Sequence, residues 1–131
     1  MSFLRFGGDP PSPWEEPYGF SRVVQAGGMV VVGGTTSVDP YGVVVGATPY
    51  EQAVEIFRKL AHELSRASAS LSQVVQTRVY VTDISRADEV GRAHGEAFGA
   101  ARPAMTMVEV SAMIDPRMLV EVEVLAAVGE D

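Results

Sequence analysis

The chain has 131 residues and a formal net charge of -7, with 47% hydrophobic and 21% charged residues. This composition predicts one globular domain with a buried core, and the acidic charge disfavours nucleic acid or an anionic membrane as the main partner. The sequence has no cysteine, which excludes disulfides, thiolate nucleophiles and cysteine zinc sites. We expect no cofactor and no metal site, because the two histidines lack metal-ligand spacing. No signal-peptide pattern and no run of membrane-spanning length is present, which predicts a soluble, cytoplasmic protein.

The N-terminal part predicts an irregular arm followed by strands. Residues 1–17 carry four of the eight prolines and are expected to form the arm, ahead of a single domain at 18–131. Two β-prone runs, Phe20–Ala26 and Met29–Val32, flank a pair of glycines and predict a hairpin. After a turn, Val43–Val45 is expected to form a third strand.

A second pair of glycines, Gly33 and Gly34, comes directly after the second β-prone run. Two glycines at a strand end indicate a bulge, or a place where another group approaches the backbone closely. Whether the strand continues through 35–38 stays open at this point.

Two helices are expected. Thr48-Pro49-Tyr50-Glu51 is a capping box with proline at the first helical position, and the apolar spacing predicts a helix that ends within Ala67–Ser70. Ser85 is the expected N-cap of the second helix, which ends near Gly99 and places His94 on its apolar stripe.

Three further runs alternate between apolar and other residues and predict strands, namely Val75–Thr82, Met105–Val110 and Leu119–Ala127. The predicted order is therefore β-β-β-α-β-α-β-β, an α/β domain with a mixed six-stranded sheet. Two helices cover only one face of such a sheet. An apolar face without a cover needs a partner, so we expect self-association through the sheet, as a closed ring.

Four stretches resemble the YjgF/RidA family of reactive-intermediate (enamine/imine) deaminases. They are Gly28–Thr35, Val74–Ile84, Arg102–Val110 and Leu119–Ala126, and the resemblance extends over roughly Tyr18 to Val128. It implies a chorismate-mutase-like α/β fold with two helices on one face. It also implies a homotrimer with small-molecule clefts between subunits.

The resemblance implies hydrolysis of 2-imino acids to 2-oxo acids and ammonia, with one departure. Met105 occupies the position of the arginine that holds the substrate carboxylate. A thioether cannot replace a bidentate, charge-assisted pair, and such a loss costs about 2–5 kcal/mol. The chain therefore resembles a divergent member of the family, and we expect a substrate other than a standard 2-imino acid.

The other site positions implied by the resemblance are matched unevenly. Glu121 matches the glutamate that positions the attacking water and is the expected catalytic residue. Gly34 and Met107 match positions that contribute backbone groups, Gly33 replaces a small polar residue, and Phe20 replaces an aromatic that is usually tyrosine. Gly91 takes the place of an asparagine.

Several roles remain open from the sequence. Glu121 either acts as a general base or pairs with an arginine such as Arg22 or Arg78. Three arginines, Arg22, Arg102 and Arg117, are candidates to replace the missing substrate-binding arginine, and Arg22 is preferred for its place beside Phe20 and ahead of the hairpin.

His94 is expected to be a core residue hydrogen-bonded to backbone, and His62 a solvated one. The alternative to an enzyme is a non-catalytic ligand-binding or chaperone-like trimer. An endoribonuclease is disfavoured by the acidic charge.

Overall fold

The computed structural model describes residues 3–129 of the chain. Six strands form one mixed sheet in the order β1-β2-β3-β6-β4-β5. The strands are β1 (Phe3–Phe6), β2 (Val23–Ala26), β3 (Met29–Thr35), β4 (Val74–Val81), β5 (Ala104–Glu109) and β6 (Val120–Ala127). The helices are α1 (Glu15–Tyr18), α2 (Pro49–Arg66) and α3 (Ala87–Phe98), with short 3-10 turns η1 (Leu71–Gln73) and η2 (Ile84–Arg86).

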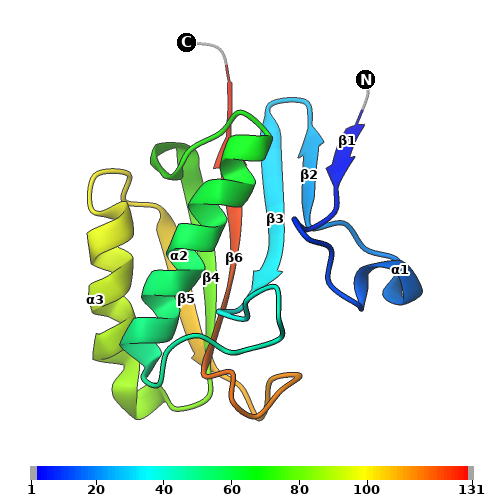
Figure 1. Cartoon of the computed structure of the whole chain (residues 1–131). Helices are drawn as coiled ribbons and strands as arrows, with labels where there is room; N and C mark the ends of the chain where they lie inside the picture. Colours follow the sequence, from blue (N-terminus) through cyan, green and yellow to red (C-terminus); the bar gives the residue numbers. More distant parts are fainter. Residues whose placement is uncertain (1–2, 130–131) are drawn as a thin grey trace.

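The two long helices lie together on one face of the sheet, and no helix of residues 3–129 covers the opposite face (Figure 1). Alternate residues of β6 are buried beneath the helices, and the residues between them face the other side. The expected α/β fold with a mixed six-stranded sheet and two helices on one face is confirmed. The core contains Leu60 and Leu64 of α2, Val90 and Phe98 of α3, and the buried valines of the sheet.

One predicted strand is absent from the sheet, and one strand of the sheet was not predicted. Val43–Val45 forms no sheet strand, because both edges of β3 are already paired with β2 and β6, and this run makes only an isolated bridge, Val38 to Val44. The sixth strand is instead β1, which lies in the segment predicted to be irregular and pairs antiparallel with β2. The same segment also holds the first residues of the one-turn helix α1, which ends at the left-handed Gly19.

The hairpin of β2 and β3 is confirmed, although β2 begins at Val23 rather than at Phe20. The backbone N–H of Phe20 donates to the carbonyl of Glu15, so this residue belongs to the end of α1. At the far edge, β5 pairs parallel with β4 and not with β6, although β5 and β6 are consecutive strands in the sequence. The helix α3 connects β4 to β5, as a parallel pair requires.

The capping box predicted for α2 is present. The Thr48 hydroxyl accepts from the Glu51 N–H at 3.1 Å, and the Glu51 carboxylate accepts from the Thr48 N–H at 3.1 Å. The cap predicted for α3 is wrong. Asp83 accepts from the Ser85 N–H at 3.0 Å and caps η2, so α3 itself begins at Ala87.

Thr48→Ala is expected to lower the free energy of unfolding by about 1 kcal/mol, because it leaves N–H groups of the first turn without an acceptor. The melting temperature should fall by about 3–5 °C in a domain of this size. The control is Ser65→Ala in the same helix, where an exposed hydroxyl contacts only the His62 carbonyl. Equal melting temperatures for Thr48→Ala and wild type would contradict the capping role.

Candidate functional site

The predicted close approach at Gly33 and Gly34 is confirmed, and two charged side chains make it. The register between β3 and β6 shifts between Val32 and Thr35, which places a bulge at the two glycines. A Cβ on Gly33 would lie 3.0 Å from Arg22 Nη2, and a Cβ on Gly34 would lie 2.4 Å from Glu121 Oε2. Neither glycine has a positive φ. These positions therefore need glycine for space rather than for backbone conformation.

Arg22 lies just ahead of β2 with a largely buried guanidinium. Its Nη2 donates to the Gly34 carbonyl at 2.5 Å and to the Thr35 hydroxyl at 3.3 Å. Its Nε is buried without a hydrogen-bond partner. Burial lowers the pKa of Arg22, and the negative charges of nearby carboxylates oppose that shift, with Glu63 first.

Glu121 is half-buried on β6 and faces Gly34 from the open side of the sheet. Burial raises the pKa of its carboxyl, the charge of Arg22 partly opposes this, and the charge of Glu123 adds to it. Within residues 3–129 the carboxylate forms no hydrogen bond and no ion pair with either Arg22 or Arg78. The carboxylate is thus held in place by packing, and its oxygens have no partner among these residues.

Met105 and Met107 lie elsewhere on the sheet. The register pairs Met105 with the buried Thr77 and Met107 with the buried Val79, so both methionines are on the helix face, whereas Glu121 pairs with Tyr80 on the open face. Strand β4 also separates β5 from β6. One chain therefore does not bring Met105 and Glu121 together.

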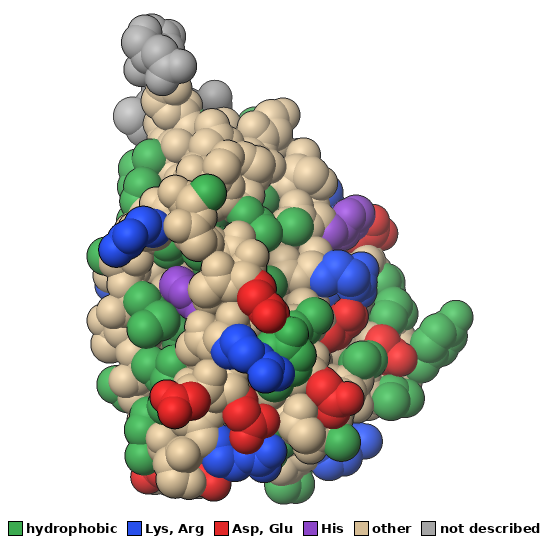
Figure 2. All heavy atoms as spheres, turned by 90° about the vertical axis from the view of Figure 1, so that its left-hand side faces the viewer, with side chains coloured by type: hydrophobic (Ala, Val, Ile, Leu, Met, Phe, Trp, Pro, Cys, Tyr) green, Lys and Arg blue, Asp and Glu red, His purple; other side chains and the backbone are tan. Residues whose placement is uncertain are grey.

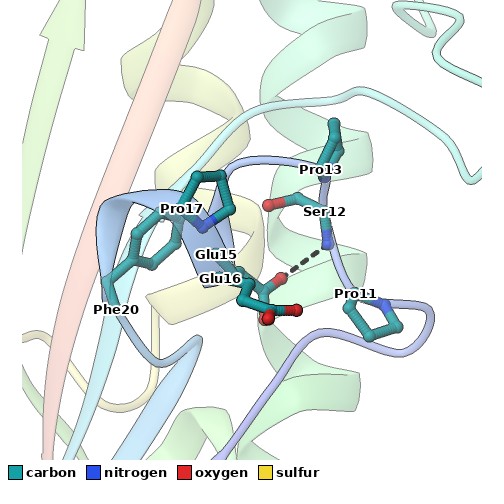
Figure 3. A pocket seen from close by; sticks show the side chains of 7 residues that line it. All are labelled: Pro11, Ser12, Pro13, Glu15, Glu16, Pro17 and Phe20. Carbon is teal, nitrogen blue, oxygen red and sulfur yellow. Dashed lines mark hydrogen bonds between the residues drawn. The ribbon is translucent and has the colours of Figure 1, made fainter.

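The last predicted site residue, Phe20, lies at the end of α1. It lines a hollow of about 620 Å³ together with Pro11, Ser12, Pro13, Glu15, Glu16 and Pro17 (Figure 3). The Glu15 carboxylate fixes this part of the chain, since it accepts from the Gly8 N–H at 2.9 Å and the Ser12 N–H at 2.7 Å. Burial raises the pKa of Glu15, but these hydrogen bonds and the charge of Arg22 bring it below its usual value. Glu121 and Gly34 do not line this hollow.

The structure separates the three candidate arginines. Only Arg22 contacts the glycine pair. Arg117 forms an exposed ion pair with Asp115 at 2.6 Å, and Arg102 is exposed ahead of β5. Arg22 is therefore the arginine placed to act together with Glu121.

The histidines lie where the sequence suggested, with one difference. His94 is buried, and its Nε2 lies 2.9 Å from the Thr77 hydroxyl, so its partner is a side chain rather than backbone. Burial lowers the pKa of His94, and its ring packs between Phe57 and Phe98. His62 is exposed.

Sequence analysis missed the polar residues that α2 turns toward the sheet. Lys59 is one of them, and its Nζ donates to the carbonyls of Thr36 and Val38 at 2.5 and 2.8 Å. Burial, with the charge of Arg22 second, lowers the pKa of Lys59 to about 8. Glu63 is buried and pairs with Arg66 at 2.7 Å. Periodicity does not reveal the contacts of Lys59, because its partners are backbone carbonyls more than twenty residues away in the sequence.

Acidic and basic side chains alternate over the side of the molecule that carries α3 (Figure 2). Across residues 3–129, no group of three or more histidine or acidic residues is arranged to hold a metal ion. In the same part of the chain, no helix is both long and apolar enough to cross a bilayer.

The fold and the site together define a class of protein. It is an α/β protein with two helices on one face of a mixed sheet, and on the other face a half-buried carboxylate packed against a glycine bulge. The family model described as endoribonuclease L-PSP matches residues 14–128. The chain belongs to this family, which is the YjgF/RidA family.

Individual relatives agree with this assignment. An uncharacterised protein of Streptomyces coelicolor is 40% identical over 118 residues, which cover 90% of this chain and 88% of the relative. A RutC family protein of Pyrococcus abyssi is 32% identical over 108 residues, and the match covers 82% of this chain and 84% of the relative. A crystal structure from Mycobacterium tuberculosis, described as a member of the YjgF/YER057c/UK114 family, superimposes with a TM-score of 0.87 at 42% identity, over 97% of this chain and 100% of that one.

Proposed function

We propose that this protein is a homotrimeric imine or enamine hydrolase, with a small-molecule site where the glycine bulge of one subunit meets a neighbouring subunit. The observation that carries the proposal is the Glu121 carboxylate, which is half-buried, packed against Gly34 and without a hydrogen-bond partner in the described chain. A carboxylate in this state is a stronger base than an exposed one, because burial raises its pKa above the usual value.

The proposed reaction adds water to a C=N bond. Glu121 accepts a proton from the water as the water oxygen bonds to the imine carbon, and it passes that proton to the nitrogen, which gives a carbinolamine. The proton of the carbinolamine hydroxyl then moves to the nitrogen, and loss of ammonia leaves a carbonyl product. In atoms, one imine and one water give one carbonyl compound and one ammonia.

A second subunit completes the site in this proposal. The open face of the sheet carries exposed apolar side chains, among them Met29 and Val31 of β3 and Val108 of β5. Such a face favours burial against another copy. In this proposal Met105, which belongs to the helix face but is 45% exposed on the edge strand β5, reaches the neighbouring subunit around the edge of the sheet. The cytoplasm is the proposed location.

The experiment is ammonia release from freshly generated imines, with and without a carboxylate, by wild type and by Glu121→Gln. We expect wild type to hydrolyse at least one imine, and Glu121→Gln to lose about 100-fold or more in kcat/KM with the oligomer intact by light scattering. Glu96→Gln, which changes an exposed carboxylate on α3, is the control and should keep wild-type rates. Equal rates for Glu121→Gln and wild type would refute the catalytic role.

The alternative function is a trimer that binds a ligand without turning it over, and the methionine at position 105 favours it. Binding of any of the tested imines without release of ammonia would support this alternative. Ribonuclease activity is disfavoured, because the net charge of -7 opposes binding of a polyanion.

A further inference from the structure

Carboxylates surround Arg22, although none of them forms an ion pair with it among residues 3–129. Three carboxylates act on its guanidinium, in the order Glu63, Glu15 and Glu121. Glu63 is itself paired with Arg66, and Glu15 accepts two backbone hydrogen bonds. The positive charge of Lys59 is directed toward backbone carbonyls. A ligand at Arg22 therefore meets a guanidinium that already has three carboxylates near it, although their charges offset the effect of burial on its pKa only in part.

The guanidinium still has hydrogen-bond capacity. Nη2 is occupied by Gly34 and Thr35, and Nε is buried. Nη1 has no hydrogen-bond partner among residues 3–129 and, unlike Nε, is not sealed from solvent. It is thus the atom that can donate to a ligand, and a donor of this kind binds any carbonyl oxygen, charged or neutral.

The Glu121 carboxylate provides the complementary acceptor beside the same two glycines. Its Oε2 packs on Gly34 while Arg22 packs on Gly33, so the acceptor and the donor flank adjacent residues of the bulge. The two groups do not contact each other, since no nitrogen of Arg22 lies within 4.0 Å of the carboxylate oxygens. A ligand that carries an acceptor next to a donor can therefore bridge them.

We propose that Arg22 and Glu121 form a subsite for a neutral carboxamide, and that this protein acts on imines carrying a carboxamide where the standard substrates carry a carboxylate. The amide carbonyl accepts from Arg22 Nη1, and the amide N–H donates to Glu121. A carboxylate in the same place has no hydrogen to donate and sets a further negative charge beside Glu121. The claim that the protein turns over such imines rests on the proposed function, whereas the subsite itself is defined by binding alone.

The test compares two stable probes, 2-oxobutanamide and 2-oxobutanoate, by calorimetry and by NMR titration of the intact protein. We expect the amide to bind at least tenfold more tightly, with shifts at the backbone amides of Gly33 and Gly34. Glu121→Gln should reverse the preference, because glutamine carries no charge and can donate to a carboxylate. Arg22→Lys should weaken both probes, and Arg78→Met, on the neighbouring strand β4, should leave the ratio unchanged.

Each other outcome counts against the subsite. Tighter binding of 2-oxobutanoate to wild type, an unchanged ratio in Glu121→Gln, or no binding of either probe at millimolar concentration would overturn it. The two proposals fail separately. A protein that prefers the amide but releases no ammonia from any imine overturns the hydrolase, and an active hydrolase that prefers the acid overturns the subsite.

Discussion

Replacing Gly34 by alanine is expected to abolish hydrolysis while the fold survives. The new Cβ would lie 2.4 Å from Oε2 of Glu121 and 3.0 Å from its Cδ, so the carboxylate must move away. The backbone tolerates alanine there, because Gly34 has no positive φ. We expect kcat/KM to fall by about 100-fold or more, as for removal of a general base. Chemical denaturation should show a loss of only about 0.5–1.5 kcal/mol, the cost of one displaced rotamer.

The matched control is Gly95→Ala on α3. A Cβ at Gly95 meets no atom within 4 Å, so this change should raise stability slightly through helix propensity and leave the rate unchanged. A Gly34→Ala protein that keeps wild-type turnover would show that Glu121 is not held at the reacting group. A protein that fails to fold would instead assign Gly34 a structural role.

Much of the framework follows from patterns that are local in sequence. The capping box at Thr48 fixes the start of α2, and alternation fixes the buried face of β6, since both signals lie within a few residues of the element they define. The pair Gly33 and Gly34 is also a local signal, because a group that approaches the backbone closely leaves room for few residue types. What the sequence could not supply was the identity of the approaching groups, Arg22 and Glu121.

The two errors in the assignment of strands share one cause, which is competition for sheet edges. Val43–Val45 has good strand propensity, but β3 has no free edge to offer it. The free edge of β2 instead accepts Phe3–Phe6, whose short apolar run lies near prolines and gives a weak local signal. Propensity describes a segment alone, whereas pairing depends on which edge remains open, and that is decided by the whole sheet.

In the candidate site, too, some features follow from the sequence and others depend on the tertiary structure. The position of Glu121 was predictable from the resemblance, but its separation from Met105 was not, because it depends on β4 lying between β6 and β5. Arg22 was preferred for its sequence neighbours, yet its contacts are with Gly34 and Thr35, more than ten residues away. The carboxylates that oppose the effect of burial on its pKa come from Glu63 of α2 and Glu15 of α1. The chemistry of this arginine is therefore a tertiary property.

Met105→Arg is expected to raise activity toward free 2-imino acids above the wild-type level. Met105 is exposed on the edge strand β5, so a longer cationic side chain fits there without disturbing the core. In the proposed trimer it projects toward the Glu121 site of the neighbouring subunit and offers a bidentate partner for a carboxylate. A contact of about 2–5 kcal/mol corresponds to a gain of roughly 30-fold to several thousand-fold in kcat/KM for 2-iminobutanoate.

The decisive controls keep the length of the side chain and change its chemistry. Met105→Gln should show no gain, and Met105→Lys a smaller gain than arginine, because an ammonium lacks the planar fork that matches a carboxylate. Adding Glu121→Gln to Met105→Arg should remove the new activity if both act in one site. A wild type that already hydrolyses 2-iminobutanoate rapidly would mean that another group holds the carboxylate, and Arg22 would then bind an anion despite its three neighbouring carboxylates. If Met105→Arg gains nothing while the oligomer stays intact, β5 of the neighbouring subunit does not reach Glu121, and the site would have to be sought within one chain.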